Sequence, residues 1–244
     1  MKDGVVLINL ISTFLLLALV MAASAQTRTV GVSVGNKFRY SATVSWSSND
    51  PNATPPSYLV DINDTQWLEV TITTISSTHT TGQITRHYKN ATETTPGGWI
   101  DADTGNGENL TAFVISANLA AGDSVYTSSP YNTWIINETV PRTYLSGVRD
   151  TNHLNITSSS GTESYRSNFY WDKSTGASVE TLQETTNQTD AYTTTWSSDF
   201  QIISSDVWTI PEFPTWPLLP LILIALTSAT MVIARQRQPK KPFR

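Results

Sequence analysis

A period-two alternation of apolar and polar side chains runs through the middle of this chain. Between residues 37 and 46, aromatic or aliphatic residues occupy every second position, from Phe38 to Trp46. The alternation recurs over residues 68–73 and again around Phe169. Because successive side chains of a β-strand point to opposite faces of a sheet, this pattern predicts strands with one apolar and one polar face.

One antiparallel hairpin can be placed within this pattern. Tyr165, Phe169 and Trp171 share one face of a strand, and residues 172–176 (DKSTG) have the composition of a turn. A return strand follows over residues 177–184. A turn between two alternating segments is typical of a hairpin.

The part of the chain between the two termini is therefore expected to be mostly β, with about eight to ten antiparallel strands. Residues 110–119 are the best candidate for a short helix. Two architectures remain open: a β-sandwich, or a single antiparallel curved meander around the short helix. In its pattern the curved meander resembles the half-barrel of lipoprotein carriers of the LolA type.

The N-terminus has the features of a secretory signal. Lys2 precedes an apolar run over residues 5–21, and Ala23-Ser24-Ala25 provides the small residues of a signal-peptidase site. We expect an N-terminal signal helix within residues 1–25 and cleavage before Gln26. An uncleaved anchor is the alternative.

The C-terminal segment predicts one transmembrane helix. Residues 216–234 form a run of 19 positions without a charge, and a helix of that length spans ~28 Å, close to the hydrocarbon thickness of a bilayer. Five cations follow in residues 235–244, so the positive-inside rule places this tail in the cytoplasm. We expect a type I single-pass protein of the plasma membrane, with an exterior domain over residues 26–201 and a linker over residues 202–215.

The tripeptide Pro211-Glu212-Phe213 stands just before this helix. Tripeptide, apolar helix and basic end, in that order, resemble the PEF-CTERM class of archaeal sorting signals over residues 210–244. The resemblance implies an archaeal surface protein whose tail is recognised and processed by an archaeosortase, a membrane transpeptidase-like enzyme. Pro211, Glu212 and Phe213 are then recognition residues on a substrate. A plain stop-transfer anchor that the mature protein keeps is the alternative.

The segment between the two terminal signals is acidic and contains no cysteine. Residues 26–210 carry nine Lys or Arg residues against 18 Asp or Glu residues. This balance argues against nucleic-acid binding, which depends on cations along the phosphate backbone. An exported domain of this size is long enough to fold on its core without disulfides.

Sequons for N-glycosylation are spread along the exterior segment. Each has the form N-x-T without proline at the middle position, which is the acceptor pattern. Together with the export signal they predict a glycoprotein that depends on the cell's glycosylation machinery. The seven acceptor residues are Asn52, Asn63, Asn90, Asn109, Asn137, Asn155 and Asn187.

Two short motifs have a chemical interpretation and a simpler structural one. Residues 31–35 match G-x-S-x-G, but no earlier strand and no helix flank them as a nucleophile elbow requires, so we expect an N-terminal strand or its lead-in. Residues 101–109 concentrate oxygen ligands for calcium at Asp101, Asp103 and Glu108. The spacing departs from an EF-hand loop, so a surface turn is expected and no metal site or cofactor is predicted.

The histidines and tryptophans also have two readings. His79, His87 and His153 lack metal-ligand spacing, so solvated or cross-strand positions are expected. Large aromatic side chains mostly fill β cores, and stacking platforms for sugars are the alternative for two or three of them. The tryptophans of the exterior segment are Trp46, Trp67, Trp99, Trp134, Trp171, Trp196 and Trp208.

These observations favour a non-enzymatic, glycosylated, membrane-anchored envelope protein with a structural or adhesive role. The alternative is an extracytoplasmic binding module for an apolar, lipid-like ligand or a glycan. An enzyme would require a histidine and carboxylates in one cleft, for instance His87 or His153 near Asp101.

Overall fold

The computed structural model describes residues 27–145 and 147–208. The predicted signal peptide, the Pro211-Glu212-Phe213 motif, the predicted transmembrane helix and the basic tail lie outside these residues. Within the described ranges, no helix is long and apolar enough to cross a membrane.

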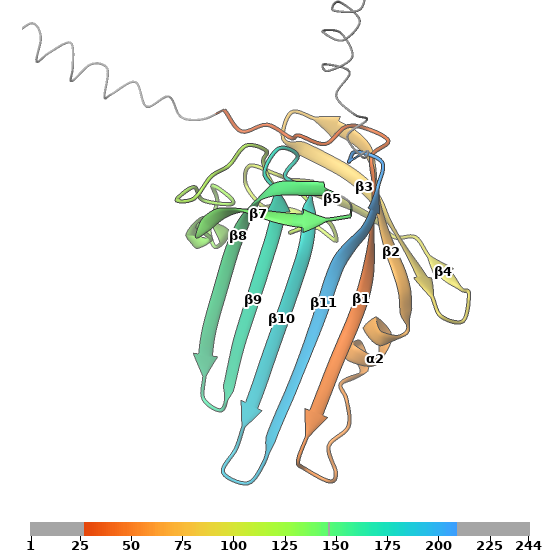
Figure 1. Cartoon of the computed structure of the whole chain (residues 1–244), viewed down its shortest axis with the longest axis vertical. Helices are drawn as coiled ribbons and strands as arrows, with labels where there is room; N and C mark the ends of the chain where they lie inside the picture. The colour runs from red at the N-terminus through yellow and green to blue at the C-terminus, as the bar shows by residue number, and fades with distance from the viewer. Residues whose placement is uncertain (1–26, 146, 209–244) are drawn as a thin grey trace, which may run out of the picture.

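The described chain is mostly β, as the alternation predicted, and forms one antiparallel sheet of 11 strands that is not closed (Figure 1). One short α-helix, α2 (Ser57–Asn63), and one 3-10 turn, η1 (Tyr131–Thr133), accompany it. The strands are β1 (Lys37–Ser48), β2 (Thr65–Ser76), β3 (His79–Tyr88), β4 (Glu93–Thr94), β5 (Gly97–Asp101), β6 (Gly107–Glu108), β7 (Glu138–Tyr144), β8 (Gly147–Ser160), β9 (Glu163–Asp172), β10 (Ser178–Gln188) and β11 (Thr193–Ser205).

The strand order shows two meanders joined in the middle of the sheet. The order is β6-β5-β3-β2-β1-β11-β10-β9-β8-β7, with β4 beside β3. The first and last strands of the chain pair with each other, from Phe38 opposite Ser205 to Ser48 opposite Thr194. The predicted hairpin of residues 165–184 is confirmed as β9 and β10.

The two faces of the sheet differ in what covers them. We call the face that carries Phe38, Tyr40, Phe169 and Trp171 the inner face; these four side chains belong to the buried core. Residues 102–137 cover this face at one end of the sheet, whereas β1 and β8–β11 run well past that cover (Figure 1). The core therefore lies at one end of the long strands.

The helix predicted over residues 110–119 is wrong. This segment is irregular, and Leu110, Val114 and Ile115 are fully buried in the core. The Phe113 amide donates to Leu110 O within a single turn, but the amides that follow bond to distant segments: the Ile115 amide donates to Gly176 O and the Ala117 amide to Thr29 O. The apolar residues of this segment have a helix-like spacing, but they are apolar because the irregular chain packs them against the sheet.

The folded domain continues beyond residue 201. β11 runs to Ser205, and Trp208 packs against Phe38 with a ring-centroid distance of 5.7 Å. Residues 202–208, expected as the first part of a linker, thus belong to the folded domain.

The turn between β9 and β10 is built around one buried carboxylate. Asp172 Oδ1 accepts hydrogen bonds from Ser174 Oγ at 2.6 Å and from Thr175 N at 2.8 Å. Its Oδ2 accepts from Arg149 Nε at 2.6 Å. Burial opposes ionisation of Asp172, but Arg149 and the two hydroxyls of the turn outweigh it, so the pKa of Asp172 lies below its usual value.

Gly176 ends this turn with φ of +71°, and a Cβ at this position would collide with the carbonyl oxygen of Ile115. We predict that Gly176→Ala lowers the free energy of unfolding by about 2–4 kcal/mol, since left-handed strain and overpacking both act. Gly161→Ala is the matched control, because Gly161 has φ of +60° and open space around it. It should cost only about 1–2 kcal/mol. Equal losses in urea unfolding would contradict the collision.

Asp172→Asn should make the free energy of unfolding less dependent on pH in the acidic range. The folded-state pKa of Asp172 is lowered, so its contribution is present above the unfolded value of about 3.9 and is lost as pH falls through the folded value. We expect the variant to lose about 3 kcal/mol at neutral pH, with the difference from wild type shrinking below about pH 4. Urea unfolding across pH measures this. Asp190→Asn, at the exposed tip between β10 and β11, should follow wild type; a pH-independent loss in Asp172→Asn would refute the ionic explanation.

Candidate functional site

An apolar groove opens on the inner face where the cover of residues 102–137 ends. It has a volume of about 180 Å³ and contains no charged side chain in its lining. Three residues come from the covering segment and four from neighbouring strands β9, β10 and β11. The lining residues are Thr111, Ala112, Phe113, Phe169, Thr181, Gln183 and Phe200.

The roof of the groove is fixed by aromatic side chains of the core. Trp171 Nε1 donates to Ala112 O at 2.7 Å, and the Ala112 amide donates to Tyr126 Oη at 3.2 Å. Ala112 has φ of +68°, a left-handed conformation that costs roughly 1–2 kcal/mol for a residue with a Cβ. Phe113 packs edge-on against Tyr40 with centroids 5.5 Å apart. The roof is thus held in one geometry.

The floor of the groove is a cross-strand row. Phe200 on β11 pairs with Thr181 on β10, which pairs with Phe169 on β9. Phe169 stacks on Trp171 at 5.5 Å and on Trp134 at 5.6 Å, so its ring is anchored from the core side. The only polar groups offered by the lining are two threonine hydroxyls and the Gln183 amide. This chemistry suits an uncharged apolar group.

The inner face remains aromatic beyond the groove, toward the hairpin tips. Trp46 on β1 pairs with Trp196 on β11, and Thr185 and Tyr165 continue this row. All three aromatic side chains are half-buried and lie outside the core cluster. We call Trp46, Trp196 and Tyr165 the aromatic strip.

A polar cluster lies on the outer face, close to the covered end. His153 stacks on Tyr170 at 4.3 Å, and its two ring nitrogens lie 2.9 Å from Glu138 Oε1 and 3.1 Å from Asn168 Oδ1. Arg142 lies over the Tyr170 ring at 4.0 Å. Both ring nitrogens of His153 are therefore engaged, one with Glu138 and one with Asn168.

The same cluster links β7 to β10, which are not neighbours in the sheet. Tyr144 Oη donates to Glu180 Oε2 at 2.8 Å, and Arg142 forms an ion pair with that oxygen at 3.0 Å. Figure 1 shows β7 lying across the upper ends of β9 and β10. Burial and then Glu180 raise the pKa of Asp199, while burial and the bond to Glu180 raise the pKa of Tyr144.

The other two histidines also occupy cross-strand positions. His87 stacks on Trp67 at 4.9 Å, and its Nδ1 lies 2.8 Å from Glu93 Oε1. His79 stacks on Trp99 at 5.1 Å and pairs in register with Asp101. Asp101 thus lies beside His79, whereas His87 and His153 contact other carboxylates, Glu93 and Glu138.

The loop considered for calcium is an internally bonded turn. Asp101 Oδ1 accepts from the amides of Asp103 and Thr104 at 2.9 and 3.2 Å, and these bonds outweigh burial in lowering the pKa of Asp101. Asp103 pairs with Arg28 at 3.3 Å, whereas Glu108 is exposed. Within residues 27–145 and 147–208, no three His, Asp or Glu side chains gather to hold a metal.

The G-x-S-x-G segment leads into β1, as expected. The amide of Asn36 donates to Ser33 O, and the Ser33 amide donates to Asn36 Oδ1, which makes a tight turn before Lys37. No helix follows this turn. The serine is therefore a turn residue.

The predicted glycosylation sites fall into two groups. Asn52, Asn63, Asn90, Asn109 and Asn137 are exposed. Asn155 and Asn187 are half-buried within strands, and Asn187 Oδ1 is buried with no hydrogen-bond partner among the described residues.

The tryptophans divide between core and sheet surface. Trp171 and Trp208 are buried in the core, and Trp134 packs against it. Trp99 is 37% exposed, and the remaining three, Trp46, Trp67 and Trp196, are half-buried on the sheet.

Two groove residues escaped the sequence analysis. Phe113 lies in the segment taken for a helix, and Phe200 lies on β11, whose pairing with β1 local patterns do not reveal. Trp196, Phe200 and Ile202 lie at even positions with polar residues between them, a period-two pattern that indicates the strand β11.

Comparisons with known proteins add no family. No family model, no curated protein and no solved structure matches this chain.

Proposed function

We propose that this protein is a membrane-anchored, glycosylated cell-surface protein whose exterior domain binds an uncharged apolar group in the groove of the inner face. The observation that carries the binding role is the groove itself, roofed by Phe113 and floored by Phe169 and Phe200 without a charged side chain. Its volume of about 180 Å³ suits one ring or a short acyl segment. Typical sites for whole small molecules measure ~300–1,000 Å³.

A longer apolar chain has a path beyond the groove. The aromatic strip lies on the same face of the same strands, and its rings are half-buried rather than covered. An open antiparallel sheet with an apolar inner face also fits the half-barrel pattern of lipoprotein carriers. A lipid-like ligand with its end in the groove is consistent with both features.

The cell-surface setting rests on the terminal segments and the sequons. The signal-like N-terminus, the apolar run and the basic tail predict a type I arrangement. Five of the sequon asparagines are exposed in the fold, which supports N-glycosylation of the exterior domain. A structural or adhesive envelope role is the second candidate, favoured by these exposed acceptors.

Dye binding tests the groove. We predict that Phe200→Gln weakens binding of the uncharged dye phenylnaphthylamine by about tenfold or more, because the loss of one buried aromatic ring removes roughly 1.5–3 kcal/mol. Ile203→Gln is the matched control, since Ile203 is 46% exposed on the same strand and does not line the groove. Fluorescence titration measures both, with circular dichroism confirming the fold.

Two results would contradict the binding role: no saturable binding to the wild-type chain, or equal weakening in both variants. In either case the structural or adhesive role becomes the better account of the exterior domain.

Mass spectrometry of the protein extracted from membranes tests the setting. We expect a mature N-terminus at Gln26 and glycopeptides from the exposed sequons. The PEF-CTERM resemblance further predicts that residues 235–244 are missing. Recovery of a peptide that contains Arg235 to Arg244 would refute processing and leave a retained anchor, and an unprocessed N-terminus would refute the cleaved signal.

A further inference from the structure

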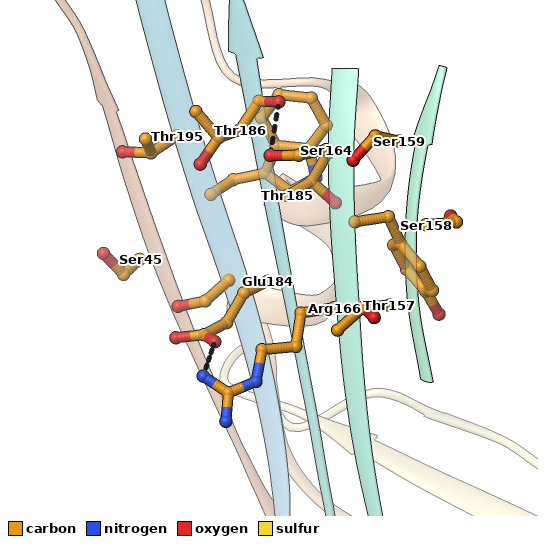
Figure 2. A pocket seen from close by; sticks show the side chains of 13 residues that line it. Ser45, Thr157, Ser158, Ser159, Ser164, Arg166, Glu184, Thr185, Thr186 and Thr195 are labelled. Atoms are coloured by element: carbon orange, nitrogen blue, oxygen red, sulfur yellow. Dashed lines mark hydrogen bonds and ion pairs between the residues drawn. The ribbon is translucent and has the colours of Figure 1, made fainter. Parts of the chain in front are cut away.

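A polar trough lies on the outer face, on the part of the sheet that extends past the core. It measures about 550 Å³ (Figure 2). One cross-strand row runs along it from β1 to β8, in the order Ser45, Ser197, Glu184, Arg166 and Thr157. The next row toward the hairpin tips contains Thr195, Thr186, Ser164 and Ser159.

The hydroxyls of this trough have unused hydrogen-bonding capacity. Ser164 Oγ donates to Thr186 O at 3.5 Å. Among the described residues, the hydroxyls of Ser45, Thr157, Thr195 and Ser197 have no hydrogen-bond partner within the protein. Each hydroxyl can donate and accept at once, as the hydroxyls of a sugar can.

The single ion pair of the trough adds directional groups without net charge. Arg166 Nη1 lies 3.8 Å from Glu184 Oε2, and both side chains are about half exposed, at 58% and 47%. In Figure 2 the pair lies at the lower end of the trough, between Ser45 and Thr157, and the other labelled hydroxyls lie above it. An arginine that donates and a glutamate that accepts suit a neutral polyhydroxylated ligand.

A predicted glycosylation site stands at the edge of this trough. In Asn155-Ile156-Thr157, Thr157 is both the sequon threonine and a trough residue. Asn155 lies two positions before Thr157 on the same outer face, about 6.6 Å along the strand. Its Nδ2 donates to Asn168 Oδ1 at 2.7 Å, which uses one of the two amide hydrogens and leaves the other position for a sugar.

The outer face along β8 differs on the two sides of Asn155. Toward the core, the next residue on this face is His153, which stacks on Tyr170 and contacts Glu138 and Asn168. That side is filled. Toward the hairpin tips lie Thr157 and the trough.

We propose that the trough is the resting place of the glycan attached at Asn155. This inference rests on the N-glycosylation that is part of the proposed function. Covalent attachment supplies an effective concentration on the order of millimolar, so weak polar contacts suffice to hold the sugar. Tyr165 and Trp196 also contribute to the lining of the trough, but their side chains belong by register to the inner face. A free sugar would therefore find little ring surface to stack on.

Hydrogen–deuterium exchange of the full chain, from a host that N-glycosylates exported proteins, tests the proposal. Wild type, Asn155→Gln and Asn63→Gln are compared after glycopeptide analysis. We expect backbone amides of residues 157–166 and 184–197 to exchange about three- to tenfold faster in Asn155→Gln, because contacts to the sugar stabilise these strands. Asn63 is exposed at the end of α2 and lines no part of the trough, so Asn63→Gln should match wild type there.

A second variant separates the trough from the sugar itself. Thr186→Val with Thr195→Val removes two facing hydroxyls while keeping side-chain shape and the sequon. The difference caused by Asn155→Gln should disappear in this background, which a double-mutant cycle measures.

Each of the other outcomes refutes either the trough proposal alone or the glycosylation on which it rests. An occupied Asn155 without an exchange difference, or an unoccupied Asn155 beside other occupied sequons, refutes the trough proposal alone. No occupied sequon at all refutes the glycosylation in the proposed function as well. Binding of free oligosaccharides to wild type and to Asn155→Gln with equal affinity would assign the trough to a free glycan and also overturn the proposal.

Discussion

The pairing of β1 with β11 joins two meanders that share no other strand pair in the described sheet. β2 to β6 extend from one side of this pair, and β10 to β7 extend from the other. The pairing sets Tyr40 beside Ile202 and Ala42 beside Phe200, so the apolar faces of the two halves become one inner face. The core, the groove and the aromatic strip all depend on that register, because a shift by one residue would turn the apolar side chains of β11 outward.

The cover over the inner face is shorter than the strands beneath it. Residues 102–137 bury the rings of Trp171 and Tyr126 completely, and the groove lies where this cover stops. Past that point the strands form a single layer whose faces differ: aromatic rings lie on one side and hydroxyls on the other. Such a layer gains little from burial of its own. An apolar ligand on one face and a sugar on the other would each supply part of the missing cover.

Local patterns in the sequence predict the strands well and their partners poorly. Alternation identifies β1, β2 and β9, and the turn at residues 172–176 identifies the β9–β10 hairpin, because these signals lie within a few residues of each other. The β1–β11 pair joins segments about 150 residues apart, as in Ser48 opposite Thr194, and no local pattern contains that information. The helix prediction over residues 110–119 failed for the same reason, because backbone partners of this segment, such as Gly176 for Ile115, lie far away in the chain. The groove needs both long-range features, so it could not be predicted.

The central position of β11 also has a mechanical consequence. A pulling force applied to the chain beyond Trp208 enters the sheet along β11, which is hydrogen-bonded to β1 on one side and to β10 on the other. The ladders on both sides would then be loaded in shear, with many hydrogen bonds sharing the force, instead of being opened one bond at a time. A strand at the edge of the sheet in the same place would peel away from a single neighbour. Any tension applied from the C-terminal side of this domain is therefore resisted by this order of strands.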